Sequence, residues 1–223
     1  MLRSLVRLLK KLPIDLGQYE VRYRTKGKRI AFDLVPDGAG KKALDVGCRD
    51  GYWSEKLKAK GYTVVSCDLE PHYPGALTLN ANQRLPLGDS EFDLVWCSEV
   101  IEHLLDAKFT VAEFKRILKP GGALVMTTPN QGFWLFQLIE KMGVRMAAIQ
   151  NEDHHQFLTY ADMQCIVGEQ EAYGYFPYML LKFRIRGLAP VLSPTIVLRH
   201  RNDKAAAGVK QAAREPQTAN LRG

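Results

Sequence analysis

Short apolar runs alternate with amphipathic segments along residues 41–130. The apolar runs have the length of buried strands, and they are KKALDVG (41–47), TVVSCDLEP (63–71), ALTLN (76–80), EFDLVWCS (91–98) and ALVMTTPN (123–130). The segments between them space their apolar residues as helices do, and they are YWSEKLKAKGY (52–62), VIEHLL (100–105) and AKFTVAEFKRILK (107–119). Strands that alternate with helices predict an α/β fold with a doubly wound, mainly parallel sheet.

Two connections in this pattern differ from the rest. The second and third predicted strands are separated by only about seven residues, so the crossover helix expected there is very short or missing. Pro120, Gly121 and Gly122 predict a turn just before the fifth strand.

The pattern continues less regularly beyond residue 130. Residues 133–143 and 159–170 have helical spacing, and residues 171–181 and 193–201 predict a closing pair of strands. We therefore expect one α/β domain over 31–200, preceded by a basic lead-in over 1–30. Residues 201–223 lack periodicity and predict a disordered basic tail.

Residues 2–12 predict a short basic amphipathic helix that ends at Pro13. Its apolar positions are Leu2, Leu5, Val6, Leu9 and Leu12. Two interpretations stay open: the helix packs on the domain, or it is a peripheral anchor on an anionic membrane surface.

Charge is unevenly distributed along the chain, whose formal net charge is +7. Residues 1–30 carry nine basic and two acidic side chains, and residues 199–223 carry six and two. The segment between them is net acidic, without the basic stripe of a nucleic-acid groove, so a nucleic-acid partner is not expected. The four cysteines stand singly, and no apolar run is long enough for a membrane span, which together predict a reduced, cytoplasmic protein.

Glycines and carboxylates follow the first two predicted strands. The first strand ends at Asp45 and Gly47, and Gly51 precedes a helix whose N-terminus favours a negative group. Asp68 ends the second strand, at about the spacing expected for an acid that accepts the hydroxyls of a ribose. This combination predicts a nucleoside-type cofactor at the carboxyl ends of the strands.

A dinucleotide cofactor fits this loop poorly. Arg49 occupies the place of the second glycine in Gly-x-Gly-x-x-Gly, where a side chain hinders close approach of a pyrophosphate. Asp45 would also repel a pyrophosphate, and an acid at this strand end favours a cationic cofactor.

The segments ALDVGCRDG, CDLEP, LPLGDSEFDLVWCSEVIEHL and ILKPGGALVMTTPN resemble the class I S-adenosylmethionine-dependent methyltransferases, in the subgroup of small-molecule and ubiquinone-type enzymes. The resemblance runs from about residue 41 to 130 and has a weaker continuation in HHQFLTYADM. It implies that the domain over 31–200 has a Rossmann-like methyltransferase fold with S-adenosylmethionine as cofactor.

The resemblance also implies roles for individual residues. Those implied to bind the cofactor are Asp45, Gly47, Cys48 and Gly51 in the glycine loop, Asp68 at the ribose, Leu69 against adenine, Asn80 at the adenine amine in place of the usual Asp, and Cys97 beneath the sulfonium. Glu99 and His103 are implied to lie beside the acceptor pocket.

A hydroxyl acceptor needs a base, and histidines are the first candidates. His103 lies on the segment after the fourth strand, and His155 precedes Phe-x-Thr in HHQFLT, where the enzymes that the chain resembles have a histidine on the acceptor side. We favour His155 as the base, with His103 as the second candidate. We expect no metal site, because the adjacent His154 and His155 rarely both reach one ion.

The function that these observations favour is O-methylation of a small-molecule, saccharide or lipid-linked acceptor. The aromatic cluster in GFWLFQLIEKMG either walls an apolar acceptor pocket or packs in the core. Two alternatives stay open: an RNA methyltransferase that uses the basic ends, and a cofactor-binding module without turnover, which Arg49 and Asn80 keep open.

Overall fold

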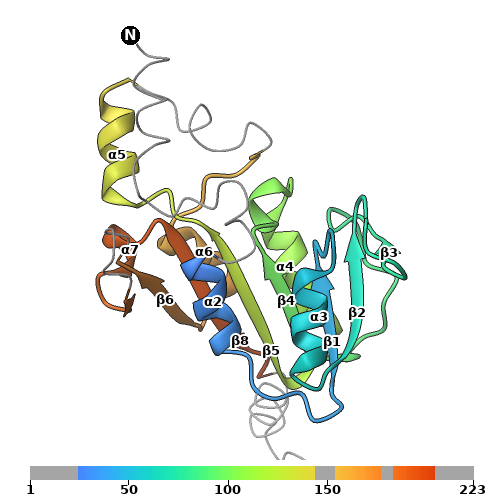
Figure 1. The fold of residues 1–223 in the computed structure, drawn as a ribbon. Coiled ribbons are helices and arrows are strands. Elements are labelled where there is room, and N and C mark those ends of the chain that lie inside the picture. Colours follow the sequence, from blue (N-terminus) through green and yellow to red (C-terminus); the bar gives the residue numbers. More distant parts are fainter. Residues whose placement is uncertain (1–24, 144–153, 177–182, 204–223) are drawn as a thin grey trace, which may run out of the picture.

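The computed structural model describes residues 25–143, 154–176 and 183–203, which form one mixed sheet flanked by helices (Figure 1). The strands occur in the spatial order β3-β2-β1-β4-β5-β8-β6-β7. Their bounds are β1 Lys42–Val46, β2 Thr63–Asp68, β3 Leu77–Thr78, β4 Phe92–Ser98, β5 Leu118–Pro129, β6 Glu171–Tyr175, β7 Arg184–Ile185 and β8 Thr195–Arg201. The strands β1 to β5 pair in parallel, whereas β8 is antiparallel to both β5 and β6.

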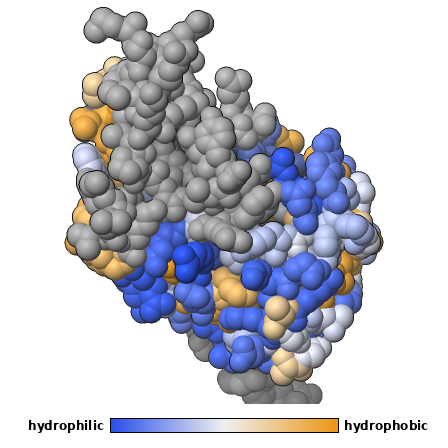
Figure 2. Space-filling model, in the orientation of Figure 1, coloured by the Kyte–Doolittle hydropathy of each residue, from blue (hydrophilic) through white to orange (hydrophobic). Residues whose placement is uncertain are grey.

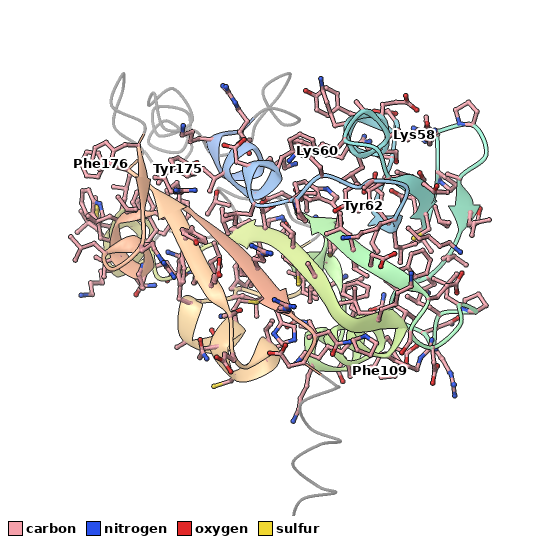
Figure 3. The ribbon with its side chains drawn as sticks, turned by 90° about the horizontal axis from the view of Figure 1, so that it is seen from below. Lys58, Lys60, Tyr62, Phe109, Tyr175 and Phe176 are labelled. Carbon is pink, nitrogen blue, oxygen red and sulfur yellow. The ribbon has the colours of Figure 1, made fainter. Side chains whose placement is uncertain are left out.

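Helices cover both faces of the sheet. Their bounds are α2 Lys26–Asp33, α3 Tyr52–Ala59, the 3-10 turn η2 Ile101–His103, α4 Ala107–Ile117, α5 Trp134–Lys141, α6 Tyr160–Val167 and α7 Ala189–Leu192. Figure 3 shows α2 and α3, with the labelled Lys58 and Lys60, on one side of the sheet, and α4, with Phe109, on the other. The sheet is therefore the middle of three layers.

The two faces of the sheet bury separate apolar clusters, because successive strand residues point to opposite sides. Leu44, Val95 and Leu124 pack with residues of α4 and α6, and the buried Phe114 lies among them. Leu94, Trp96 and Val125 pack on the other face with residues of α2 and α3. The central strands are thus apolar on both sides, as expected for parallel strands covered by helices.

The predicted α/β architecture is confirmed, and the five predicted strands and the helices predicted over 52–62 and 107–119 are present. The helix predicted over 100–105 is only the 3-10 turn η2. Residues 69–76, which connect β2 and β3, contain no helix, as the short spacing predicted. The predicted closing pair of strands is also present, since Glu171 of β6 pairs with Arg199 of β8.

The predicted turn at Pro120–Gly122 was wrong in form, because these residues belong to β5. Phe92 pairs with Leu118, and Leu94 pairs with Ala123, so residues 119–122 bulge opposite Asp93. Gly121 takes φ 77°, which a glycine adopts without strain. The chain therefore passes from α4 into the sheet through a bulge.

Helix α2 was not predicted, because most of its sequence, KGKRIAFD, falls in the basic segment over 1–30 that was taken as a lead-in. Ile30 and Ala31 nevertheless pack in the core, and the Thr25 hydroxyl accepts from the Lys28 amide as an N-cap. The predicted helix over 2–12 and the residues from 204 onward lie outside the described residues.

Among the described residues, no helix is long and apolar enough to cross a membrane. Figure 2 shows mostly hydrophilic residues over α2 and α3, with hydrophobic ones at the margin beside α5 and α7. Leu138 and Met142 near the end of α5, and Leu188 and Val191 by α7, are exposed large side chains of that margin.

Candidate active site

The order of the strands reverses between β1 and β4, since β2 and β3 extend the sheet on one side and β5 on the other. In an open α/β sheet, this switch point leaves a crevice at the carboxyl ends of the strands. The residues that follow β1, β2, β4 and β5 at this edge define the candidate site.

The loop after β1 has a conformation that requires glycine. Gly47 and Gly51 have φ 75° and 78°, and Arg49 has φ 46°, where a non-glycine residue is strained. A Cβ on Gly47 would lie 2.2 Å from the Val100 side chain, and one on Gly51 would lie 2.1 Å from the Tyr73 ring. The loop therefore has no room for side chains at its two glycines.

Backbone hydrogen bonds hold this loop against the end of β2. The amides of Gly47 and Cys48 both donate to the Cys67 carbonyl, at 2.8 and 3.0 Å. The Arg49 amide donates to Oδ2 of Asp68 at 2.9 Å. The strand ends of β1 and β2 thus form one connected rim.

Asp68 lies on that rim with its carboxylate partly exposed. Its second oxygen, Oδ1, accepts from the Glu70 amide at 3.1 Å. Each carboxylate oxygen can accept more than one hydrogen bond, so the group retains capacity for ribose hydroxyls. The next residue, Leu69, is 59% exposed and offers an apolar surface beside it.

Asp45 lies beneath the loop instead of on its open side, with 1% of its surface exposed. Its Oδ2 accepts from the Ser54 hydroxyl at 2.6 Å, and the Ser54 and Ser66 hydroxyls are 2.7 Å apart. Burial raises the pKa of the Asp45 carboxyl to about 7, against the lowering effect of Ser54. Asp45 therefore couples the loop to α3 and β2 from below.

The other cofactor residues expected from the sequence lie at the same edge. Asn80 is partly buried, and its Oδ1 accepts from the Asn82 amide at 2.9 Å. Cys48 and Cys97 are both buried, and burial raises the pKa of the Cys48 thiol to about 12. Cys97 packs in the core on the α4 side of the sheet, so its thiol is a packing group there.

At the ends of β4 and β5, the structure brings together Glu102, His103 and His154. Their ligand-type atoms all lie within 4.8 Å of one another, and the rings of His103 and His154 meet edge to face at 4.7 Å between centroids. Of the two adjacent histidines, His154 is therefore the one beside His103. His155 is exposed and reaches the cluster through its backbone, whose amide donates to the Glu102 carbonyl at 2.9 Å.

Glu102 was not singled out from the sequence, although it is the acid of this cluster and is buried, with 2% of its surface exposed. The Thr128 hydroxyl donates to its Oε2 at 3.0 Å. Burial and repulsion from Glu99 raise the pKa of the Glu102 carboxyl well above its ordinary value, and Lys28 opposes this. A glutamate directly before a predicted site histidine was the signal available in the sequence.

The aromatic cluster after β5 packs largely in the core. Phe133 and Phe136 are 1% and 3% exposed, and their rings meet edge to face at 5.0 Å. Asn130 is also buried, and its amide donates to the carbonyls of Pro190 and Ser193. These residues fix the end of β5 to the segment around α7.

A family model described as a methyltransferase domain matches residues 17–170, which is more than half of the chain. The chain belongs to this methyltransferase-domain family. Its fold is the class I fold of S-adenosylmethionine-dependent methyltransferases.

Curated relatives carry a more specific name. The ubiquinone biosynthesis O-methyltransferase of Aromatoleum aromaticum is 32% identical over 45% of this chain and 50% of that protein. The protein of the same name from Psychrobacter cryohalolentis is 31% identical over 56% of each. The chain thus spans about half the length of the curated relatives it matches.

Solved structures share the fold at low identity. An S-adenosylmethionine-dependent methyltransferase from Archaeoglobus fulgidus has a TM-score of 0.59 and 16% identity, over 82% of this chain and 97% of that one. A Thermotoga maritima protein described as a possible histamine N-methyltransferase has a TM-score of 0.57 and 15% identity, over 91% and 96%.

The residues at the strand ends fit S-adenosylmethionine. Helix α3 begins at Tyr52, and its N-cap, Gly51, provides no side-chain cap. The Ser54 amide of its first turn interacts with the Asp45 carboxyl, and the N-terminus of the helix favours a negative group. The Asp68 carboxylate can accept hydrogen bonds from the ribose hydroxyls. The exposed Leu69 side chain next to it offers an apolar surface for adenine. The glycine loop lies between these groups and α3.

Proposed function

We propose that this protein transfers a methyl group to a hydroxyl of a small-molecule acceptor. The observation that carries the proposal is the shared edge of the sheet. The glycine loop and Asp68 lie at the ends of β1 and β2, and the Glu102–His103–His154 cluster lies at the ends of β4 and β5. Cofactor and acceptor groups would then meet across the switch point.

The cofactor supplies an activated methyl group, so the protein mainly has to position it and the acceptor. In the proposal, Asp68 accepts the ribose hydroxyls and Leu69 packs against adenine. The first amides of α3 bind the amino-acid carboxylate, and Asn80, whose NH2 group is not used in the contact with Asn82, lies at the adenine edge. These residues set the distance and direction of attack.

The acceptor hydroxyl must lose its proton during or before attack. We place it beside His103, where imidazole and carboxylate groups converge. His155 stays the base implied by the family resemblance, and its side chain is exposed beside the cluster. A small acceptor is supported by the names of the relatives, which are ubiquinone biosynthesis O-methyltransferases.

The proposal is tested with Asp68→Ala and Asp68→Asn. Asp68 accepts hydrogen bonds as a carboxylate, and hydrogen bonds to charged groups contribute roughly 1.5–3 kcal/mol each. We therefore expect at least a tenfold loss of S-adenosylmethionine affinity in titration calorimetry for either variant. Asp33→Ala on the exposed side of α2 is the matched control and retains the affinity. Unchanged affinity in both Asp68 variants would contradict the assigned cofactor site.

The acceptor class is tested with methyl-labelled cofactor and fractionated cell extract. Label is expected in the fraction of small polar or lipid-linked metabolites. Label in RNA, or cofactor binding without label in any fraction, would instead support one of the two alternatives.

A further inference from the structure

The cluster at the ends of β4 and β5 contains the atoms of a metal site. One carboxylate oxygen of Glu102 and one nitrogen each of His103 and His154 lie within 4.8 Å of one another. Ligands about 2.1 Å from one ion are at most about 4.2 Å apart, so only small side-chain adjustments would bring all three onto an ion. The arrangement combines residues that are about fifty positions apart in the sequence.

A second carboxylate lies next to this group. Glu99 is close enough to Glu102 for the two carboxylates to repel each other. The Oε1 atom of Glu99 is buried and has no hydrogen-bond partner within the described part of the chain. Glu99 also takes φ 56°, a strained conformation for a non-glycine residue at the end of β4. A buried carboxylate oxygen without a donor calls for a cation nearby.

Lys28 is a cation near this group. It comes from α2 and favours the ionised form of Glu102.

Backbone contacts hold His154 in place. The amides of His155 and Gln156 both donate to the Glu102 carbonyl, at 2.9 and 3.0 Å. The Gln156 side chain donates to the Leu104 carbonyl at 2.7 Å. The segment that carries His154 is thereby joined to η2, which carries Glu102 and His103, and the fold itself presents the three side chains together.

We propose that Glu102, His103 and His154 bind a divalent first-row metal ion at the acceptor side of the site, with the Glu99 carboxylate nearby. Two imidazoles and one carboxylate are a mixed nitrogen and oxygen set, which suits Mn²⁺, Fe²⁺ or Zn²⁺ better than a thiolate-seeking ion. The sequence alone argued against a metal because it paired His154 with His155. The structure pairs His154 with His103 instead.

The role of the ion rests on the proposed function. Three protein ligands leave positions open on a metal ion that accepts four to six, and an acceptor hydroxyl can fill one of them. Binding there lowers the pKa of the hydroxyl and orients its oxygen toward the edge where the cofactor lies. Attack by the oxygen on the methyl carbon then forms the C–O bond as the C–S bond breaks, and the hydroxyl proton leaves to a neighbouring base.

Metal binding is tested on the full chain with Mn²⁺, by the loss of its free-ion electron paramagnetic resonance signal. We expect the wild type to bind one equivalent, with Zn²⁺ in competition. Glu102→Gln and His154→Ala are expected to weaken binding at least tenfold, since loss of outer contacts alone costs about 10–100-fold at metal sites. His155→Ala, one residue away and exposed, is the matched control and retains the ion.

S-Adenosylmethionine titration of the same variants separates this inference from the proposed function. Cofactor binding without Mn²⁺ binding in the wild type would overturn the metal site and leave the methyltransferase assignment intact. Mn²⁺ binding without cofactor binding would support the metal site and contradict the methyltransferase assignment. Equal Mn²⁺ affinity in wild type, Glu102→Gln and His154→Ala would also overturn the metal site, as would loss of the ion in His155→Ala alone.

Discussion

Asp45 is a buried acid beneath the glycine loop, and its titration affects folding. Its pKa is about 7 in the folded protein, against an ordinary value of 3.8 for an exposed aspartate in the unfolded chain. Between these values, the folded state binds the proton more tightly than the unfolded state. The free energy of unfolding therefore falls as the pH rises from about 4 to about 7, and this contribution is constant above that.

Asp45→Asn removes this titration while it keeps an oxygen for the Ser54 hydroxyl. Denaturant unfolding of both proteins at pH 5 and pH 8 measures the effect. We expect the variant to gain on the order of 2 kcal/mol relative to the wild type between these pH values. Asp33→Asn on the exposed side of α2 is the control and follows the wild type. Parallel curves for wild type and Asp45→Asn would contradict the raised pKa.

Single residues differ in how far the sequence determined their place. Gly47 and Asp68 lie at the ends of predicted strands, and Gly51 lies in the loop after the first, so their position at one edge of the sheet follows from local sequence. The contact between His103 and His154 depends on how residues distant in the chain are folded back. No local pattern contains that distance, and His155 was favoured from the sequence through the resemblance of HHQFLT to the family pattern.

At the scale of elements, strongly apolar segments were predicted best. Strand β4 is buried along most of its length, and its residues form a nearly continuous apolar run. Helix α2 has few apolar residues and was missed, because its place comes from tertiary contacts of Ile30 and Ala31. The Pro120–Gly122 bulge was taken as a turn because both need the same residues, and pairing with β4 decides between them.

Asn202, which follows β8, links this strand to the end of α4 and the start of β5. Its side-chain amide donates to the carbonyls of Lys115, Leu118 and Lys119, which end α4 and begin the bulge. Its backbone amide donates to Gly122, and its carbonyl accepts from Gly121. The side chain is 4% exposed, so water cannot replace it at these carbonyls.

Asn202→Ala is therefore expected to lower the free energy of unfolding by about 1–3 kcal/mol, the cost of buried groups left unsatisfied. Denaturant unfolding measures the change, and Asp203→Ala at the exposed neighbouring position is expected to stay within about 0.5 kcal/mol. S-Adenosylmethionine affinity should be unchanged, because Asn202 lies beside the amino end of β5 whereas Asp68 is at the carboxyl end of β2. A stability equal to that of the wild type would show that other contacts hold the bulge.

At the scale of the whole molecule, the contacts that stabilise the fold and the candidate site lie at opposite ends of the parallel strands. The amino ends of the strands carry the bulge and its Asn202 contacts, and the carboxyl ends carry the glycine loop and the Glu102 cluster. The switch point between β1 and β4 divides the carboxyl edge further. The proposed cofactor residues follow β1 and β2, and the proposed metal ligands follow β4 or come from residue 154, so two ligands can bind side by side.

Hydrogen exchange tests this division on the complete chain. S-Adenosylmethionine is expected to slow exchange of amides in 47–51 and 68–80, because a ligand protects the backbone that it orders. Mn²⁺ is expected to slow exchange in 99–103 and 154–156, where the ligands and their backbone contacts lie. Gly121 and Asn202 serve as internal controls and keep their rates. Identical footprints for the two ligands would mean that one site binds both, and would contradict separate cofactor and acceptor sides of the crevice.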